Sequence, residues 1–216
     1  MSASLRNGKR PSMRRAPRVM AGVLTAVLSA AAACRPSAPS SPSETAAQFY
    51  TLLDGLGVRG VPDSLALDAV RPYLDTALVQ LLIEARQARD SVARLVPREK
   101  PPFIDGDLFS SLFEGNTSFG IRRVIQRGDT TFAVMAFTNA MQPPTVRWTD
   151  TLVIVPRANP APKSPQFVIA DLRYGAAWDF GNRGTLLGGM RAALSVDSTA
   201  VTPAACATPP CGTAPR

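Results

Sequence analysis

The chain of 216 residues contains no histidine, and this absence excludes more chemistry than any other feature of its composition. Without an imidazole, the chain cannot build the Ser-His or Cys-His pairs that activate a nucleophile, and it lacks a principal ligand of zinc and copper. An enzyme built on this sequence would therefore depend on carboxylates, tyrosine or lysine. We expect no cofactor and no metal site.

Cysteine is scarce as well, with three residues in the whole chain. Cys34 ends an apolar run near the N-terminus, whereas Cys206 and Cys211 lie close together near the C-terminus. If Cys34 is modified, an even number of cysteines is left, and Cys206 and Cys211 could close a short disulfide loop in an oxidising compartment. Metal binding by this pair is disfavoured because no further ligand stands near it.

Acidic residues are missing from residues 1–33, which hold six of the 24 basic residues. A run of small and apolar residues follows the last of these charges and ends at Cys34. Positive charge, an apolar run and small residues in this order are typical of a signal peptide. The run is shorter than the ~20 residues of a membrane-spanning helix. Residues 1–33 are therefore predicted to be removed on export.

Two processing routes remain open. Ala31, Ala32 and Ala33 suit an ordinary small-residue cleavage site, while Leu28 and the alanines before Cys34 resemble a bacterial lipobox, whose cysteine is acylated. A lipobox usually has a larger aliphatic residue where Ala31 stands. We favour acylation because a Pro/Ser-rich tether follows Cys34 directly and because acylation leaves an even number of cysteines. Several acyl chains, at ~0.8 kcal/mol per buried methylene, would hold the protein on a bacterial envelope membrane, facing the periplasm.

The net charge of +8 belongs mainly to the predicted signal peptide. After residue 33 the chain keeps 18 basic residues against 16 acidic ones, a net charge of +2. A domain that binds nucleic acid would be expected to keep a concentrated basic patch. The one adjacent basic pair that remains is Arg122-Arg123. Nucleic acid is therefore disfavoured as a partner.

The rest of the chain divides by composition into a tether, one domain and a tail. Residues 34–43 form the lipidated cysteine and the Pro/Ser-rich tether. Residues 44–194 have the length of a single domain with its own core. Residues 195–216 are rich in Ala, Thr and Pro, and we expect them to be disordered.

Capping residues and apolar periodicity predict helices first and strands second. The first helix has a capping box at Ser41 and Glu44, a short helix begins at Asp63 or Ser64, and Asp75 can cap a long third helix. Alternating residues then predict four strands, near residues 119–125, 131–138, 145–155 and 166–174, and Thr185 can cap a closing helix. The predicted fold is α+β, with N-terminal helices packed on a four-stranded antiparallel sheet and a C-terminal helix closing it.

Five short sequence segments, together with this order of helices and strands, resemble a family of bacterial envelope proteins that carry domain of unknown function 3828. That family is related to the cone-shaped nuclear-transport-factor-2-like fold. The five segments are residues 47–50 (AQFY), 70–74 (VRPYL), 102–105 (PFID), 167–174 (FVIADLRY) and 184–187 (GTLL). The resemblance implies a cone-like arrangement of helices and sheet. Relatives of this fold include enzymes with a pocket carboxylate as well as non-catalytic binding modules, so the fold does not decide the function.

The candidate site residues are carboxylates and aromatic residues. Asp105 and Asp107 could begin a calcium loop or supply a base, but later positions of such a loop hold no carboxylate, so we favour Asp107 as the cap of a helix starting near Leu108. Asp171 alternates with apolar residues in the fourth strand. If that face of the strand turns toward the concave side of the sheet, Asp171 could act as a pocket base with Asp150, Trp148 or Tyr174 nearby. A surface ion pair with Arg173 or Arg147 is the simpler interpretation.

These observations favour an envelope-anchored, non-catalytic lipoprotein that binds a small ligand or a protein in the periplasm. Two alternatives remain. A carboxylate-based enzyme of the same fold would place Asp171 or Asp105 in a closed apolar pocket. An inhibitor or immunity-type protein against an envelope-acting enzyme would instead present an exposed apolar patch.

Overall fold

The computed structural model describes residues 38–58, 60–141, 143–176 and 178–200. The chain divides after Pro36, and all of these residues belong to the second unit. The predicted signal peptide, Cys34, Cys206 and Cys211 lie outside the described residues. Within the described ranges, no helix combines the length and the apolar character that crossing a membrane requires.

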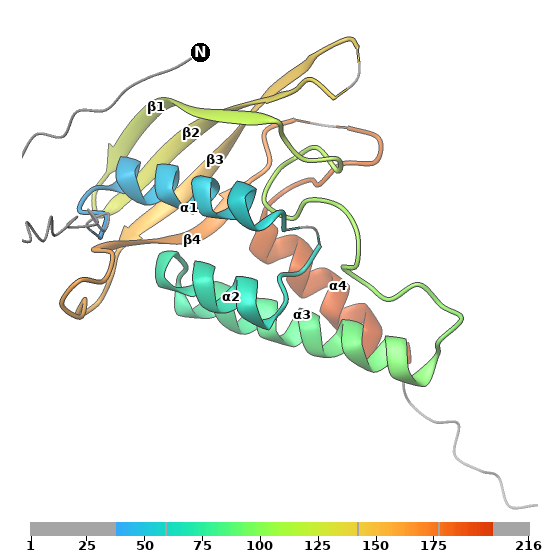
Figure 1. Ribbon diagram of the computed structural model, residues 1–216. Helices are drawn as coiled ribbons and strands as arrows, with labels where there is room; N and C mark the ends of the chain where they lie inside the picture. The colour runs from blue at the N-terminus through green and yellow to red at the C-terminus, as the bar shows by residue number, and fades with distance from the viewer. Residues whose placement is uncertain (1–37, 59, 142, 177, 201–216) are drawn as a thin grey trace, which may run out of the picture. The chain divides into compact units, whose positions relative to one another are not determined.

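The first helix, α1 (Pro42–Leu56), begins and ends as its sequence predicts. The Ser41 hydroxyl accepts a hydrogen bond from the Glu44 backbone N–H, and the Glu44 carboxylate accepts one from the Ser41 N–H. At the other end, Gly57 adopts a left-handed conformation (φ 59°), which costs glycine little and ends the helix. The buried face of α1 carries Phe49, Tyr50 and Leu53 and contacts all four strands (Figure 1).

Two aspartates start the next helices. The Asp63 carboxylate accepts from the Ala66 N–H at the start of α2 (Ser64–Val70), and the Asp75 carboxylate accepts from the Ala77 N–H at the start of α3 (Thr76–Leu95). Between them, the short 3-10 turn η1 (Arg71–Tyr73) contains Pro72, which lacks the N–H that a continuous helix would need. The predicted helix boundaries in this region are therefore confirmed.

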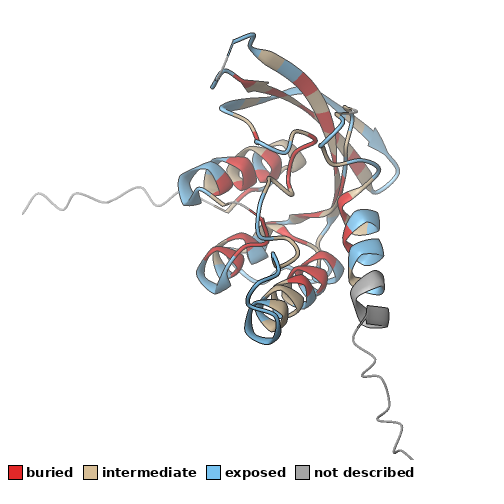
Figure 2. Ribbon diagram, turned by 90° about the vertical axis from the view of Figure 1, so that its right-hand side faces the viewer, coloured by how far each residue is buried: buried red, intermediate tan, exposed pale blue. Residues whose placement is uncertain are grey.

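The four strands form one antiparallel sheet in the order β1-β2-β3-β4. Their bounds are β1 Ser118–Arg127, β2 Thr130–Asn139, β3 Val146–Pro156 and β4 Phe167–Arg173. Burial alternates along β2 and β3, so that Met135, Phe137 and Leu152 point into the core while their neighbours are partly exposed. Figure 2 shows the same division in the helices, whose buried positions lie on one side and exposed positions on the other. The predicted α+β fold, with helices on one face of the sheet, is confirmed.

The last helix, α4 (Leu186–Ala200), packs against α3 and β4. The Thr185 hydroxyl accepts from the Gly188 N–H at 3.1 Å, as the sequence predicts for a cap. The helix continues to Ala200, into the segment from residue 195 onward that composition predicts as a disordered tail. Residues 201–216 lie outside the described residues.

The segment between α3 and β1 differs from its prediction. Apolar residues after Asp107 suggest a helix starting near Leu108, but residues 96–117 contain turns and bends without a helix. The Asp107 carboxylate does accept a hydrogen bond from the Phe109 N–H (2.7 Å), two residues on, which forms an isolated turn instead of a helix cap. Phe109, Ser110 and Ser111 are buried in this turn, so tertiary contacts hold the segment.

Candidate functional site

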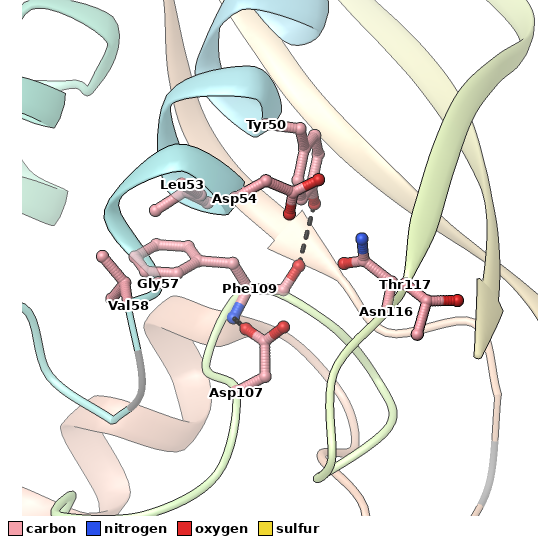
Figure 3. Close-up of a pocket in the computed structure, with 9 residues that line it drawn as sticks. All are labelled: Tyr50, Leu53, Asp54, Gly57, Val58, Asp107, Phe109, Asn116 and Thr117. Atoms are coloured by element: carbon pink, nitrogen blue, oxygen red, sulfur yellow. Dashed lines mark hydrogen bonds between the residues drawn. The ribbon is translucent and has the colours of Figure 1, made fainter. Parts of the chain in front are cut away.

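A polar cavity of about 240 Å³ lies between the second half of α1 and residues 107–117 (Figure 3). Its wall combines carboxylates, an amide and a hydroxyl with apolar side chains. The residues that line it are Tyr50, Leu53, Asp54, Gly57, Val58, Asp107, Phe109, Asn116 and Thr117. Figure 3 shows the α1 residues approaching from one side and Asn116 and Thr117 from another.

Helical spacing explains the α1 side of the cavity. Tyr50, Leu53, Asp54 and Gly57 stand at positions i, i+3, i+4 and i+7, which share one face of a helix. Leu53 is buried toward the core, whereas Asp54, one position further around the helix, is exposed. Since Gly57 ends the helix, the chain turns there and Val58 closes this end of the wall.

Hydrogen bonds hold the opposite wall in place. The Tyr50 hydroxyl donates to the Phe109 carbonyl (2.8 Å), which ties the buried turn to α1. The Thr117 hydroxyl donates to the Thr138 carbonyl (3.0 Å) and accepts from the Ala140 N–H (3.1 Å), which ties the segment to the end of β2. The Tyr50 and Thr117 hydroxyls thus hold the walls of the cavity through hydrogen bonds within the protein.

The charge of the cavity is negative. Asp54 and Asp107 line it, and none of its described lining residues is basic. Burial raises the pKa of Tyr50 well above the usual tyrosine range, and the charges of Asp150 and Asp107 raise it further. Tyr50 therefore stays neutral and acts as a hydrogen-bond donor. The cavity attracts cations and polar groups with N–H or O–H donors.

The Asn116 side chain adds a donor to this wall. Its Nδ2 atom is buried, and within the described part of the chain it has no hydrogen-bond partner. Buried amide nitrogens in proteins nearly always have an acceptor, supplied by protein, water or a ligand. A molecule in this cavity would satisfy Asn116 if it offered an acceptor, and positive charge on that molecule would be attracted by the Asp54 and Asp107 carboxylates.

The residues that the sequence suggested as a site have different surroundings in the structure. Asp107 lines the cavity, whereas Asp105 is exposed and pairs with Lys100. The Tyr174 hydroxyl donates to the Leu108 carbonyl (2.7 Å), and burial raises its pKa well above the usual range. Asp171 accepts from the Leu187 N–H (3.0 Å) at the start of α4, and in addition from the Leu172 N–H (2.8 Å).

Trp148 and Asp150 belong to the core. The Trp148 ring stacks on Phe137, with ring centroids 5.5 Å apart, and its Nε1 donates to an Asp150 oxygen at 3.1 Å. Asp150, only 1% exposed, also accepts from the N–H groups of Ser111 and Gly175, each at 2.8 Å, and from the Ser111 hydroxyl. This carboxylate joins the segment before β1 and the loop after β4 to the centre of the sheet.

Comparison with protein-family models, curated proteins and solved structures found no match. The resemblance to domain of unknown function 3828 therefore stays a prediction. Of the residues that line the cavity, the sequence suggested only Asp107 as a site candidate; the polar residues Asp54 and Asn116 are among those that it missed. Asp54 could have been found, because it lies four positions after Tyr50 on the predicted first helix. Asn116 carries no such signal, since it lies in an irregular segment.

Proposed function

We propose that this chain is an envelope-anchored, non-catalytic lipoprotein that binds a small, positively charged polar molecule in the cavity between α1 and residues 107–117. The anchor is the acylated Cys34, as its sequence context predicts. The observation that carries the proposal is the buried Asn116 Nδ2 without an acceptor, in a wall that also holds Asp54 and Asp107. These groups together suit a ligand with an amine and a nearby hydroxyl or carbonyl oxygen.

The size of the cavity restricts the ligand further. About 240 Å³ accommodates a small amine, an amino alcohol or an amino sugar, and it is too small for a peptide of several residues. The apolar side chains of Leu53, Val58 and Phe109 provide a surface for a short carbon skeleton. We therefore assign the ligand class as compact cationic amines that carry hydroxyl or carbonyl groups.

The environments of the buried acids and tyrosines favour binding over catalysis. Tyr50 and Tyr174 are neutral donors to backbone carbonyls, and Asp150 and Asp171 accept backbone N–H groups. A general base must be within reach of the proton that it removes and available to take it. The hydrogen bonds of these four groups position loops and helix ends, which is a structural role.

Calorimetric titration tests the proposed ligand class. We expect glucosamine or ethanolamine to bind the wild-type protein, whereas glucose and acetate do not. Asp54→Asn should weaken amine binding by about 2- to 5-fold, since an ion pair at an exposed carboxylate contributes about 0.2–1 kcal/mol. Asp129→Asn, in the exposed β1–β2 turn, makes the same charge change outside the cavity and should leave the affinity unchanged. Equal affinity of wild type and Asp54→Asn would contradict the proposal.

A second candidate function rests on an apolar groove of about 400 Å³ beyond the end of β2. It is lined mainly by apolar side chains, including Leu112, Val146 and the 77% exposed Met141. Trp178 also lines the groove, and its Nε1 is buried without a partner among the described residues. Such a surface suits a protein partner, as an inhibitor or immunity-type protein would require.

A further inference from the structure

The face of the sheet that points away from α1 carries three arginines around one aromatic ring. Arg123 and Arg127 come from β1 and Arg173 from β4, and all three are exposed. The Phe132 ring of β2 lies under two of them, with the Arg173 guanidinium carbon 4.9 Å and that of Arg127 5.9 Å from the ring centroid. The register pairs Arg123 with Val134 and Thr151 with Arg173, which places these residues on the same face.

These side chains line a groove of about 200 Å³ on that face. The lining residues are Arg123, Ile125, Arg127, Phe132, Val134, Thr151 and Arg173, with no acid among them. Within the described residues, none of the three arginines makes an ion pair or a side-chain hydrogen bond, and Arg127 and Arg173 lie over the Phe132 ring. The groove thus combines three positive charges with an apolar floor.

The acids of the sheet offset the positive charge of this groove only in part. The four strands and the β1–β2 turn contain Asp129, Asp150 and Asp171. Asp150 is buried on the opposite face, where it accepts from Ser111. Asp171 lies two residues before Arg173 on the same side of β4, where its carboxylate accepts hydrogen bonds from the Leu172 and Leu187 N–H groups. Asp129 remains as the exposed acid, in the turn beyond Arg127. An anionic surface is the electrostatic complement of this face.

The start of the domain lies at the same end of the sheet as Arg127. The Gln166 N–H donates to the Pro39 carbonyl (3.2 Å), so the chain is attached to the sheet just before β4. The antiparallel order puts this point at the same end of the sheet as the β1–β2 turn and Arg127. Five peptide steps separate Cys34 from Pro39, and even a fully extended chain spans at most ~18 Å over that length.

We propose that the arginine groove, formed by Arg123, Arg127, Arg173 and Phe132, docks on anionic phospholipid headgroups of the membrane that carries the anchor. The proposal rests on the anchor in the proposed function and is independent of the amine cavity. A tether of at most ~18 Å keeps the sheet at a high effective concentration near the lipid surface, so weak contacts suffice. Guanidinium groups bind phosphate oxygens in a bidentate manner, and the apolar floor suits the boundary between headgroups and acyl chains.

Vesicle binding by residues 34–216 carrying Cys34→Ser, which lack both the acyl anchor and the basic signal peptide, tests the groove. The lipids are phosphatidylcholine alone and phosphatidylcholine mixed with phosphatidylglycerol. The test variant is Arg123→Gln/Arg127→Gln/Arg173→Gln. The matched control removes three exposed arginines from helices and the loop after α3, as Arg94→Gln/Arg98→Gln/Arg191→Gln. Circular dichroism checks that each variant is folded, and the double variant Arg123→Gln/Arg127→Gln replaces the triple variant if the latter is unfolded.

We expect the groove variant to lose roughly 100-fold in affinity for the anionic vesicles, because each basic residue near such a surface contributes about 1 kcal/mol. The double variant should lose roughly 25-fold by the same reasoning. The control variant should change much less, and added salt should weaken wild-type binding. Equal losses in the groove and control variants, or no loss in the groove variant, would overturn the proposal.

Three further measurements separate this proposal from the others. Binding of poly-glutamate at the groove, without binding of anionic vesicles, would overturn the lipid assignment in favour of an acidic protein. Asp54→Asn should leave vesicle binding unchanged, so failure of the amine cavity is distinguishable from failure of the groove. Mass spectrometry of the wild-type protein shows separately whether Cys34 is acylated; an unmodified Cys34 would overturn the docking of an anchored domain, even if the groove binds vesicles.

Discussion

Asp150→Ala is expected to be among the most destabilising single substitutions in this domain. The carboxylate is 1% exposed and accepts hydrogen bonds from Ser111, Trp148 and Gly175, which lie in three different segments. Alanine leaves the backbone N–H groups of Ser111 and Gly175 and the Trp148 Nε1 without an acceptor. The Ser111 hydroxyl can rotate to another acceptor, so we count three donors and not four.

Each buried donor without an acceptor costs about 1–3 kcal/mol. Water can enter the space that the carboxylate leaves, so values near the lower end of this range apply. We therefore expect Asp150→Ala to lower the free energy of unfolding by about 3–5 kcal/mol, a large part of the 5–15 kcal/mol of a typical domain. The melting temperature should fall by roughly 10 °C, at about 2–4 °C per kcal/mol for a domain of this size.

Chemical denaturation followed by tryptophan fluorescence measures this loss, since Trp148 is itself a partner of Asp150. Asp129→Ala, in the exposed β1–β2 turn, serves as the control and should change stability by less than about 0.5 kcal/mol. Proteolysis should become faster at residues 107–117 and after β4, because Asp150 joins both segments to the sheet. A loss of less than about 1 kcal/mol would refute the argument that these hydrogen bonds hold the segments.

Three further predictions concern the tyrosines, the last helix and the anchor. The pKa values of Tyr50 and Tyr174 are raised in the folded state, so their contribution to stability is fully present below the ordinary tyrosine pKa of about 10 and falls as the pH rises above it. Denaturation at pH 8 and pH 11 should therefore show that the stability of Tyr50→Phe depends less on pH than that of the wild type. Asp171→Ala should lower stability by about 1 kcal/mol through loss of an acceptor at the start of α4, with Asp129→Ala again unchanged, and a wild-type melting temperature would contradict this role. Membrane fractionation should release Cys34→Ser into the soluble fraction, and retention equal to wild type would contradict the lipid anchor.

Local signals explain why much of the fold was predictable. Ser41, Asp63, Asp75 and Thr185 each act on a helix start within three residues, so the sequence alone predicts their roles. Alternation of apolar residues likewise locates the strands. The segment after Asp107 was predicted wrongly because its apolar residues are buried by tertiary contacts without forming a helix.

The site and the arginine groove depend on residues that are distant in sequence. Asn116 becomes part of the cavity wall only when residues 107–117 pack beside α1. A search for adjacent basic residues finds Arg122-Arg123, but the groove combines Arg123 and Arg127 of β1 with Arg173 of β4. Strand pairing brings these charges together, and a single sequence does not encode that pairing in any local pattern.

The most direct test of the proposed function observes the Asn116 side-chain amide during titration with an amine. In a two-dimensional ¹⁵N–¹H spectrum, Asn116→Ser identifies the signal by its loss. We predict that glucosamine or ethanolamine shifts this signal together with the Asp54 and Asp107 backbone amides. An amine that binds while the Asn116 side-chain signal stays unchanged would contradict the claim that the cavity between α1 and residues 107–117 is the binding site.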